Sequence, residues 1–126
     1  MNKKVLIGKN SILGFALVSL STLLLSFGQI LYKEGAMRFT LDFYALITNY
    51  PLLLGVVVHF AAFLLFITAL KHGTLSFIYP VVATGYLWVN ILAVVFLNEA
   101  VSQIEWSGVF LIMIGIMLIT VGDKSG

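Results

Sequence analysis

Four long apolar stretches, separated by shorter polar segments, dominate the chain. They cover residues 11–32, 51–70, 75–97 and 103–122. A helix that crosses the hydrocarbon core of a bilayer needs about 20 mostly apolar residues, and its backbone groups must bond within the segment. None of the stretches alternates with the period of two that a membrane barrel strand requires. The pattern predicts an all-α integral membrane protein, in which residues 1–126 form a single domain of four transmembrane helices.

The segments between the stretches carry signals for helix ends. Pro51 suits the first turn of the second helix, where its missing N–H costs no hydrogen bond. Ser102 and Glu105 match the S-x-x-E capping box at the start of the fourth helix. The longer connection 35–50 is rich in Phe and Tyr, which favour the lipid–water boundary. Part of it is expected to form a short helix on the membrane surface.

The composition excludes several classes of protein. Of the 126 residues, 61% are hydrophobic and 10% are charged, whereas a soluble domain carries about 25% charged residues. The absence of cysteine excludes disulfides and thiolate chemistry. The sequence has no phosphate-binding loop, no HExxH or GxSxG motif and no cluster of acids for a metal. We therefore expect neither an enzyme nor a cofactor, and no basic tract is large enough to predict nucleic-acid binding.

Lysine and arginine are distributed unevenly between the two sides of the predicted membrane domain. The positive-inside rule places the richer side in the cytoplasm, so both termini are predicted to be cytoplasmic. The difference of five against two is modest and leaves dual insertion open. The residues counted are Lys3, Lys4, Lys9, Lys71 and Lys124 on the richer side, and Lys33 and Arg38 on the other.

A polar stripe runs along the first span. Its members, three or four residues apart, share one helix face: Ser19, Thr22, Ser26, Gln29 and Lys33. Close helix packing is the favoured explanation for the three hydroxyl residues. Lys33 lies near the helix end and can snorkel to the interface at little cost, but Gln29 lies one turn deeper. An amide and an ammonium stacked in this way predict a donor-rich site for an anionic or polyhydroxyl head group.

The third span has a second polar face and an internal proline. Tyr79, Tyr86 and Asn90 share one face, and Pro80 frees a backbone carbonyl one turn earlier. Two interpretations carry equal weight. The face lines a transport cavity, or the proline is a packing kink and the tyrosine hydroxyls bond to neighbouring backbone. The first is favoured if this face meets the stripe on the first span.

Two further ionisable residues lie outside these stripes. His59, near the middle of the second span, is a functional candidate because of its depth. A neutral side chain bonded to a neighbouring hydroxyl is the simpler interpretation. Glu99, in the third connection, is most simply a solvated loop acid; the alternative is a partner for Lys33 across the membrane surface.

The fourth span has little polar content and a regular glycine pattern. Gly108, Gly115 and Gly122 recur every seven residues on one side of the helix. Small residues on one face permit close contact between helices. Gly108 and Gly115 are therefore predicted to lie in a dimer interface.

Three segments resemble the four-helix, EamA-like members of the drug/metabolite transporter superfamily: SFGQILYKEGA, LSFIYPVVATGYLWVNILAVVFLNEAVS and IEWSGVFLIMIGIMLITVG. Two branches are similar in size. The small multidrug resistance exporters carry a proton- and cation-binding glutamate at the position of Leu25, so the chain departs from them at the residue their mechanism needs. The GQ…YK and YLWVN segments are more similar to flippase subunits that move aminoarabinose-phosphoundecaprenol.

This resemblance implies a bacterial inner-membrane transporter or flippase that moves a lipid-linked or phosphorylated small molecule, of undecaprenyl-phosphate-sugar type, without modifying it. Four helices are too few to enclose a path, so a homodimer, or a heterodimer with a homologous small subunit, is expected in the lipid bilayer. A homodimeric exporter of cations or metabolites, and a non-transporting subunit, remain as alternatives. The residues predicted to bind substrate are Gln29, Lys33, Tyr79, Tyr86, Asn90 and Glu99.

Overall fold

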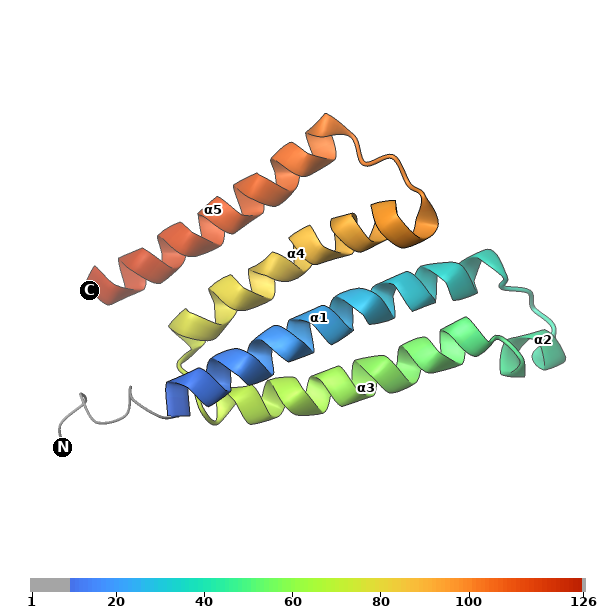
Figure 1. Cartoon of the computed structure of the whole chain (residues 1–126), viewed down its shortest axis with the longest axis horizontal. Coiled ribbons are helices and arrows are strands. Elements are labelled where there is room, and N and C mark those ends of the chain that lie inside the picture. Colours follow the sequence, from blue (N-terminus) through green and yellow to red (C-terminus); the bar gives the residue numbers. More distant parts are fainter. Residues whose placement is uncertain (1–9, 126) are drawn as a thin grey trace.

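The computed structural model describes residues 10–125, and side chains for residues 12–122, and within this range the chain forms five α-helices and no strand (Figure 1). Four of them are long and apolar enough to cross a membrane. The prediction of an all-α protein with four candidate spans is therefore confirmed. The helices are α1 (Asn10–Met37), α2 (Phe43–Ile47), α3 (Tyr50–Leu70), α4 (Leu75–Leu97) and α5 (Gln103–Ser125).

The predicted and observed spans differ most at the end of α1. The helix continues past Tyr32 to Met37. Arg38 and Glu34, which lie one helical turn apart, form an ion pair in which Arg38 Nη2 is 2.6 Å from Glu34 Oε1. This pair supports the added turn. This turn is charged, so the apolar pattern that marks a span no longer reveals it.

Side-chain caps fix the starts of two long helices. The Asn49 amide oxygen accepts from the backbone N–H of Leu52 at 3.3 Å, and its amide nitrogen donates to the Gly35 carbonyl at 2.8 Å. Asn49 thus ties the start of α3 to the end of α1. At α5, the Ser102 backbone N–H donates to Glu105 Oε2 at 2.6 Å and the Glu105 N–H donates to Ser102 Oγ at 3.3 Å. The predicted capping box is confirmed.

The expected short helix in the first connection is α2. Its N-cap is Asp42, which accepts from the backbone N–H of Ala45 at 3.2 Å. Phe43 and Tyr44 on this helix are mostly exposed. Exposed aromatic rings beside the end of a span suit the lipid–water boundary.

The four long helices lie side by side in the order α3, α1, α4 and α5, so that α1 and α4 are the inner helices (Figure 1). One side of α1 packs along α3 and another packs against α4, while α5 packs against α4 at the edge. The helix ends near α2 and the α4–α5 connection form one end of the bundle, called the α2 end below. The short α3–α4 connection lies at the opposite end. This order brings α1 and α4, which carry the two predicted polar faces, into contact.

Two glycines allow α1 and α3 to approach closely. The His59 ring of α3 lies over Gly28 of α1, and the Tyr32 ring of α1 lies over Gly55 of α3. The two rings stack on each other with centroids 4.4 Å apart. Each ring therefore fills the space that the opposing glycine leaves free, and this reciprocal packing holds the two helices together.

Most large apolar side chains point away from the bundle. Among the described residues, the fully buried apolar cluster is small and centres on Val18, Ala69 and Ile78. Residues such as Val57 on α3 and Leu118 on α5 are exposed. In lipid such side chains need no burial, because the acyl chains around them are as apolar as they are.

Candidate functional site

A polar cavity of about 240 Å³ lies between α1, α4 and α5. The residues that line it are Thr22, Leu25, Ser26 and Gln29 on α1, Val82, Gly85, Tyr86, Val89 and Asn90 on α4, and Val109 on α5. The cavity brings the stripe on the first span against the polar face of the third. This is the arrangement on which the cavity interpretation of α4 depended.

Three polar side chains in this cavity have unused hydrogen-bonding capacity. Gln29, Tyr86 and Asn90 make no hydrogen bond to any residue that the structure describes. Gln29 and Tyr86 are exposed, and Asn90 is half-buried. Two amides and a phenol offer donors and acceptors together. Side chains of this kind within spans can replace the water around a polar solute.

Two of the hydroxyls deeper in the stripe, those of Thr22 and Ser26, are already satisfied. Thr22 Oγ1 donates to the Val18 carbonyl at 2.8 Å, and Ser26 Oγ donates to the Thr22 carbonyl at 2.8 Å. Ser26 Oγ also lies 3.3 Å from the Gly85 carbonyl on α4. Thr22 and Ser26 thus serve helix packing, as the sequence predicted. Thr22, Ser26 and Gly85 line the polar cavity where α1 packs against α4.

An ion pair joins α1 to the α4–α5 connection at the α2 end. Lys33 Nζ lies 2.5 Å from Glu99 Oε1 and 2.6 Å from Glu99 Oε2. Asn98 adopts the left-handed conformation (φ 52°) at the end of α4, and the backbone N–H of Glu99 donates a hydrogen bond to the Ala93 carbonyl at 3.3 Å. Glu99 is therefore not a free loop acid, and the alternative interpretation, a partner for Lys33, is confirmed. The Lys33 side chain is 51% exposed, so the pair remains open to exchange with a ligand.

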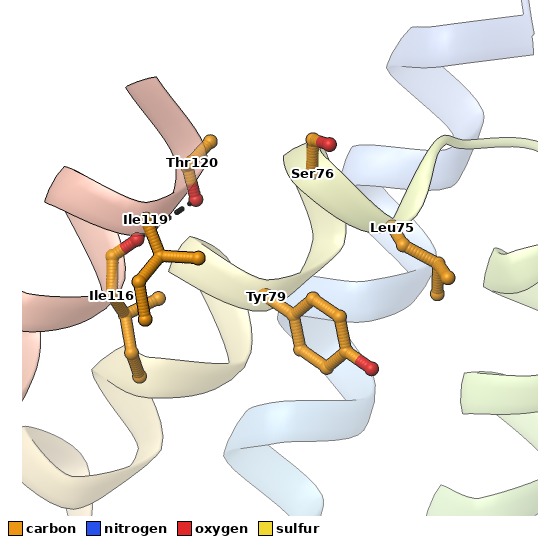
Figure 2. A pocket seen from close by; sticks show the side chains of 6 residues that line it. All are labelled: Leu75, Ser76, Tyr79, Ile116, Ile119 and Thr120. Atoms are coloured by element: carbon orange, nitrogen blue, oxygen red, sulfur yellow. Dashed lines mark hydrogen bonds between the residues drawn. The ribbon is translucent and has the colours of Figure 1, made fainter. Parts of the chain in front are cut away.

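Tyr79 is not in the polar cavity, although the sequence grouped it with Tyr86 and Asn90. It lines a second cavity between α4 and α5, called the apolar groove below (Figure 2). Tyr79 precedes Tyr86 by seven residues, which is about 10 Å along the helix. The two tyrosines thus share a face of α4 but belong to different cavities. The residues that define the apolar groove are Leu75, Ser76, Tyr79, Ile116, Ile119 and Thr120.

His59 lies in the α1–α3 interface and does not line the polar cavity. Its Nδ1 is 3.1 Å from the Gly55 carbonyl one turn earlier. The expectation of a hydroxyl partner was wrong, because the ring nitrogen lies beside a backbone carbonyl of its own helix. Donation to that carbonyl requires the tautomer with a proton on Nδ1.

The two glycines predicted to form a dimer contact lie on α5. A Cβ atom added at Gly108 or Gly115 would meet nothing within 4 Å. Neither glycine is therefore needed for packing within the described part of this chain. Their role between two subunits stays a prediction.

Two polar residues that organise the site were not singled out from the sequence. Ser21 is fully buried, and its hydroxyl donates to the Ala62 carbonyl on α3 at 2.8 Å. Asn49 links α1 to α3 through the bonds described above. Each fixes α1, which carries Gln29 and Lys33. A capping signal before Pro51 could have revealed Asn49, whereas the partner of Ser21 depends on tertiary packing.

Four candidate spans, three of which line a polar cavity, define a small multi-pass membrane protein of the transporter type. The chain belongs to a family of flippase subunits, that of the ArnE proteins. It is 30% identical over 112 residues to a protein of Photorhabdus laumondii named "Probable 4-amino-4-deoxy-L-arabinose-phosphoundecaprenol flippase subunit ArnE", covering 88% of this chain and 99% of the relative. A protein of Serratia proteamaculans with the same name is also 30% identical over 112 residues, covering 87% and 97%.

No family model matches the chain, and no solved structure matches it. The placement in the wider EamA-like superfamily therefore rests on the resemblance of the three segments.

Proposed function

We propose that this protein is one subunit of a bacterial inner-membrane flippase that moves a lipid-linked amino sugar from one leaflet to the other. The observation that carries the proposal is the polar cavity, in which Gln29, Tyr86 and Asn90 have no partner among the described residues. The names of the two relatives supply the substrate class, an aminoarabinose joined through phosphate to undecaprenol. The protein acts by transport and not by chemical conversion.

The Lys33–Glu99 pair suits the two charges of such a head group. The phosphodiester is anionic and takes the place of the Glu99 carboxylate on Lys33. The amino group of the sugar is cationic and takes the place of Lys33 on Glu99. An exposed ion pair contributes only about 0–1 kcal/mol, so exchanging it for two new pairs costs little. The sugar hydroxyls then bond to Gln29, Tyr86 and Asn90.

A second subunit completes the path in this proposal. The polar cavity is open on one side, and α5 lies at the edge of the bundle with Gly108 and Gly115 uncovered. These glycines form the contact with a homologous small membrane protein or with a second copy. Both termini face the cytoplasm in the proposed orientation.

The exporter alternative is weaker because of one residue in the cavity wall. Leu25 lines the polar cavity at the position where the small multidrug resistance exporters carry a glutamate. A leucine binds neither a proton nor a cation. No Asp or Glu is among the residues that line this cavity, so the described site offers no acid for proton-coupled export of cations.

Transport by the reconstituted protein tests the proposal. The full chain, alone and with a homologous small subunit, would be placed in liposomes that hold undecaprenyl-phosphate-aminoarabinose. An amine reagent that cannot cross the bilayer would report head groups that reach the outer leaflet. We expect faster labelling than in protein-free liposomes, and no acceleration for phosphatidylethanolamine, which has an amine but no sugar. Equal rates for both lipids, or none above the protein-free rate in either assembly, would contradict the proposal.

Charge-exchange variants sharpen the same assay. Lys33→Glu places two carboxylates together and should lower both stability and transport. Adding Glu99→Lys restores an ion pair of reversed direction and should restore the thermal midpoint. The transport rate should remain at least about tenfold below that of the unchanged protein, because the phosphate then meets a carboxylate at position 33. If the exchanged pair restored transport as well, the pair would be only structural.

A further inference from the structure

The apolar groove is the larger of the two cavities described here, at about 400 Å³. Figure 2 shows Ile116 and Ile119 on α5 facing α4, while the Tyr79 hydroxyl points away from α5. Of the residues with hydroxyls on its wall, Ser76 and Thr120 already have partners. Thr120 Oγ1 donates to the Ile116 carbonyl at 2.9 Å, and Ser76 also has an interaction partner. The groove therefore presents mainly hydrocarbon to whatever enters it.

The groove and the polar cavity follow one seam between α4 and α5. On α4, Tyr79 precedes Val82 by three residues and Tyr86 by seven, so the walls of both cavities lie on one helix face. On α5, Val109 of the polar cavity and Ile116 of the groove are also seven residues apart. The seam is thus polar toward the α2 end and apolar toward the opposite end.

The length of this seam matches a membrane-spanning ligand. From Leu75 to Asn90, α4 rises about 22 Å, which is most of a hydrocarbon core of about 30 Å. A single ligand with a polar head and an apolar chain would match both parts of the seam. Neither a free sugar phosphate nor a hydrophobic cation would.

We propose that the apolar groove binds the first part of the hydrocarbon tail of the substrate while the polar cavity holds its head group. This inference rests on the proposed function and adds a binding site for the tail. A packed helix is about 10–12 Å across, so a helix from a second copy is too thick for a recess between two neighbouring spans. An extended hydrocarbon chain is thin enough to enter it.

The polar and apolar ends of the seam fix the orientation of the bound lipid, and this orientation matches that of the lipids in one of the two leaflets. With its head toward Lys33 and Glu99 and its tail toward the α3–α4 connection, the ligand lies as a lipid of the leaflet at the α2 end does. In the proposed orientation this is the outer leaflet.

Photocrosslinking tests the groove separately from transport. A benzophenone side chain would replace Ile119, which lines the groove, or Leu118, the neighbouring control residue on a lipid-facing part of α5; both are exposed. The full-length variants would be irradiated in liposomes that contain labelled undecaprenyl phosphate. We expect several-fold more labelling from position 119, reduced by unlabelled undecaprenyl phosphate but not by added phosphatidylglycerol.

Three results would overturn the inference. They are equal labelling from positions 118 and 119, competition by phosphatidylglycerol as effective as that by undecaprenyl phosphate, and crosslinking from position 119 mainly to a second protein chain. The outcome is distinguishable from failure of the proposed function. Specific crosslinking without head-group movement would retain the tail site and reject the flippase. Head-group movement without specific crosslinking would retain the flippase and reject the tail site.

Discussion

Replacing both Gln29 and Asn90 with leucine is expected to lower head-group translocation by about a hundredfold, with each single change costing about tenfold. An unmade hydrogen bond to a desolvated polar group costs about 1–3 kcal/mol, and 1.4 kcal/mol corresponds to about tenfold in a rate or binding constant. Both side chains line the polar cavity and have no partner in the described structure, so their loss removes contacts to the solute only. The liposome assay measures the effect.

The matched control for this prediction is Thr68→Val. Thr68 is exposed on α3, and its hydroxyl bonds to the Leu64 carbonyl of its own helix, away from the cavity. It should transport at the rate of the unchanged protein. The thermal midpoints of Gln29→Leu and Asn90→Leu should stay at or above that of the unchanged protein, because neither residue holds the fold. Unchanged transport in the double variant would leave the polar cavity without a role in translocation.

Changing Gly35 to alanine is expected to lower stability, whereas the same change at a described glycine whose added Cβ would meet nothing within 4 Å is not. The added Cβ would lie 2.8 Å from the backbone nitrogen and 3.0 Å from the Cα of Leu52 on α3. Backbone cannot rotate away, so α1 and α3 must separate, at a cost of about 1–3 kcal/mol. The separation would also strain the bond from Asn49 to the Gly35 carbonyl.

Denaturation in detergent micelles, followed by circular dichroism, would measure this loss. Gly122→Ala is the control, since a Cβ there would meet nothing within 4 Å. It should match or slightly exceed the stability of the unchanged protein, because alanine favours a helix over glycine. Equal stabilities for the two variants would show that α1 and α3 do not pack as closely as described.

The sequence was sufficient to predict the spans because lipid imposes a simple rule. Twenty apolar residues with internally bonded backbone must form a helix, and α3, α4 and α5 follow that rule to within three residues. The capping box at Ser102 was predictable for a similar reason, since all its atoms lie within four residues. The charged last turn of α1 was missed because no hydropathy signal marks it.

The site was only partly predictable. The spacing of Gln29 and Asn90 assigned each to a polar face, but nothing in the sequence states that the two faces meet. The same spacing grouped Tyr79 with Asn90, although the two residues line different cavities, since a helix face says nothing about depth. The Lys33–Glu99 pair joins residues 66 positions apart and depends on the left-handed turn at Asn98, which local patterns do not reveal.

Substrate protection of single cysteines tests the central claim, that Gln29 and Asn90 face one cavity that receives the head group. The chain has no cysteine, so Gln29→Cys, Asn90→Cys and the control Thr68→Cys each introduce a single thiol. A small charged thiol reagent would be applied with and without undecaprenyl-phosphate-aminoarabinose. The account predicts that positions 29 and 90 are both modified and are protected over the same range of lipid concentration, while position 68 is unprotected. Protection at only one of the two positions, or at neither, would contradict it.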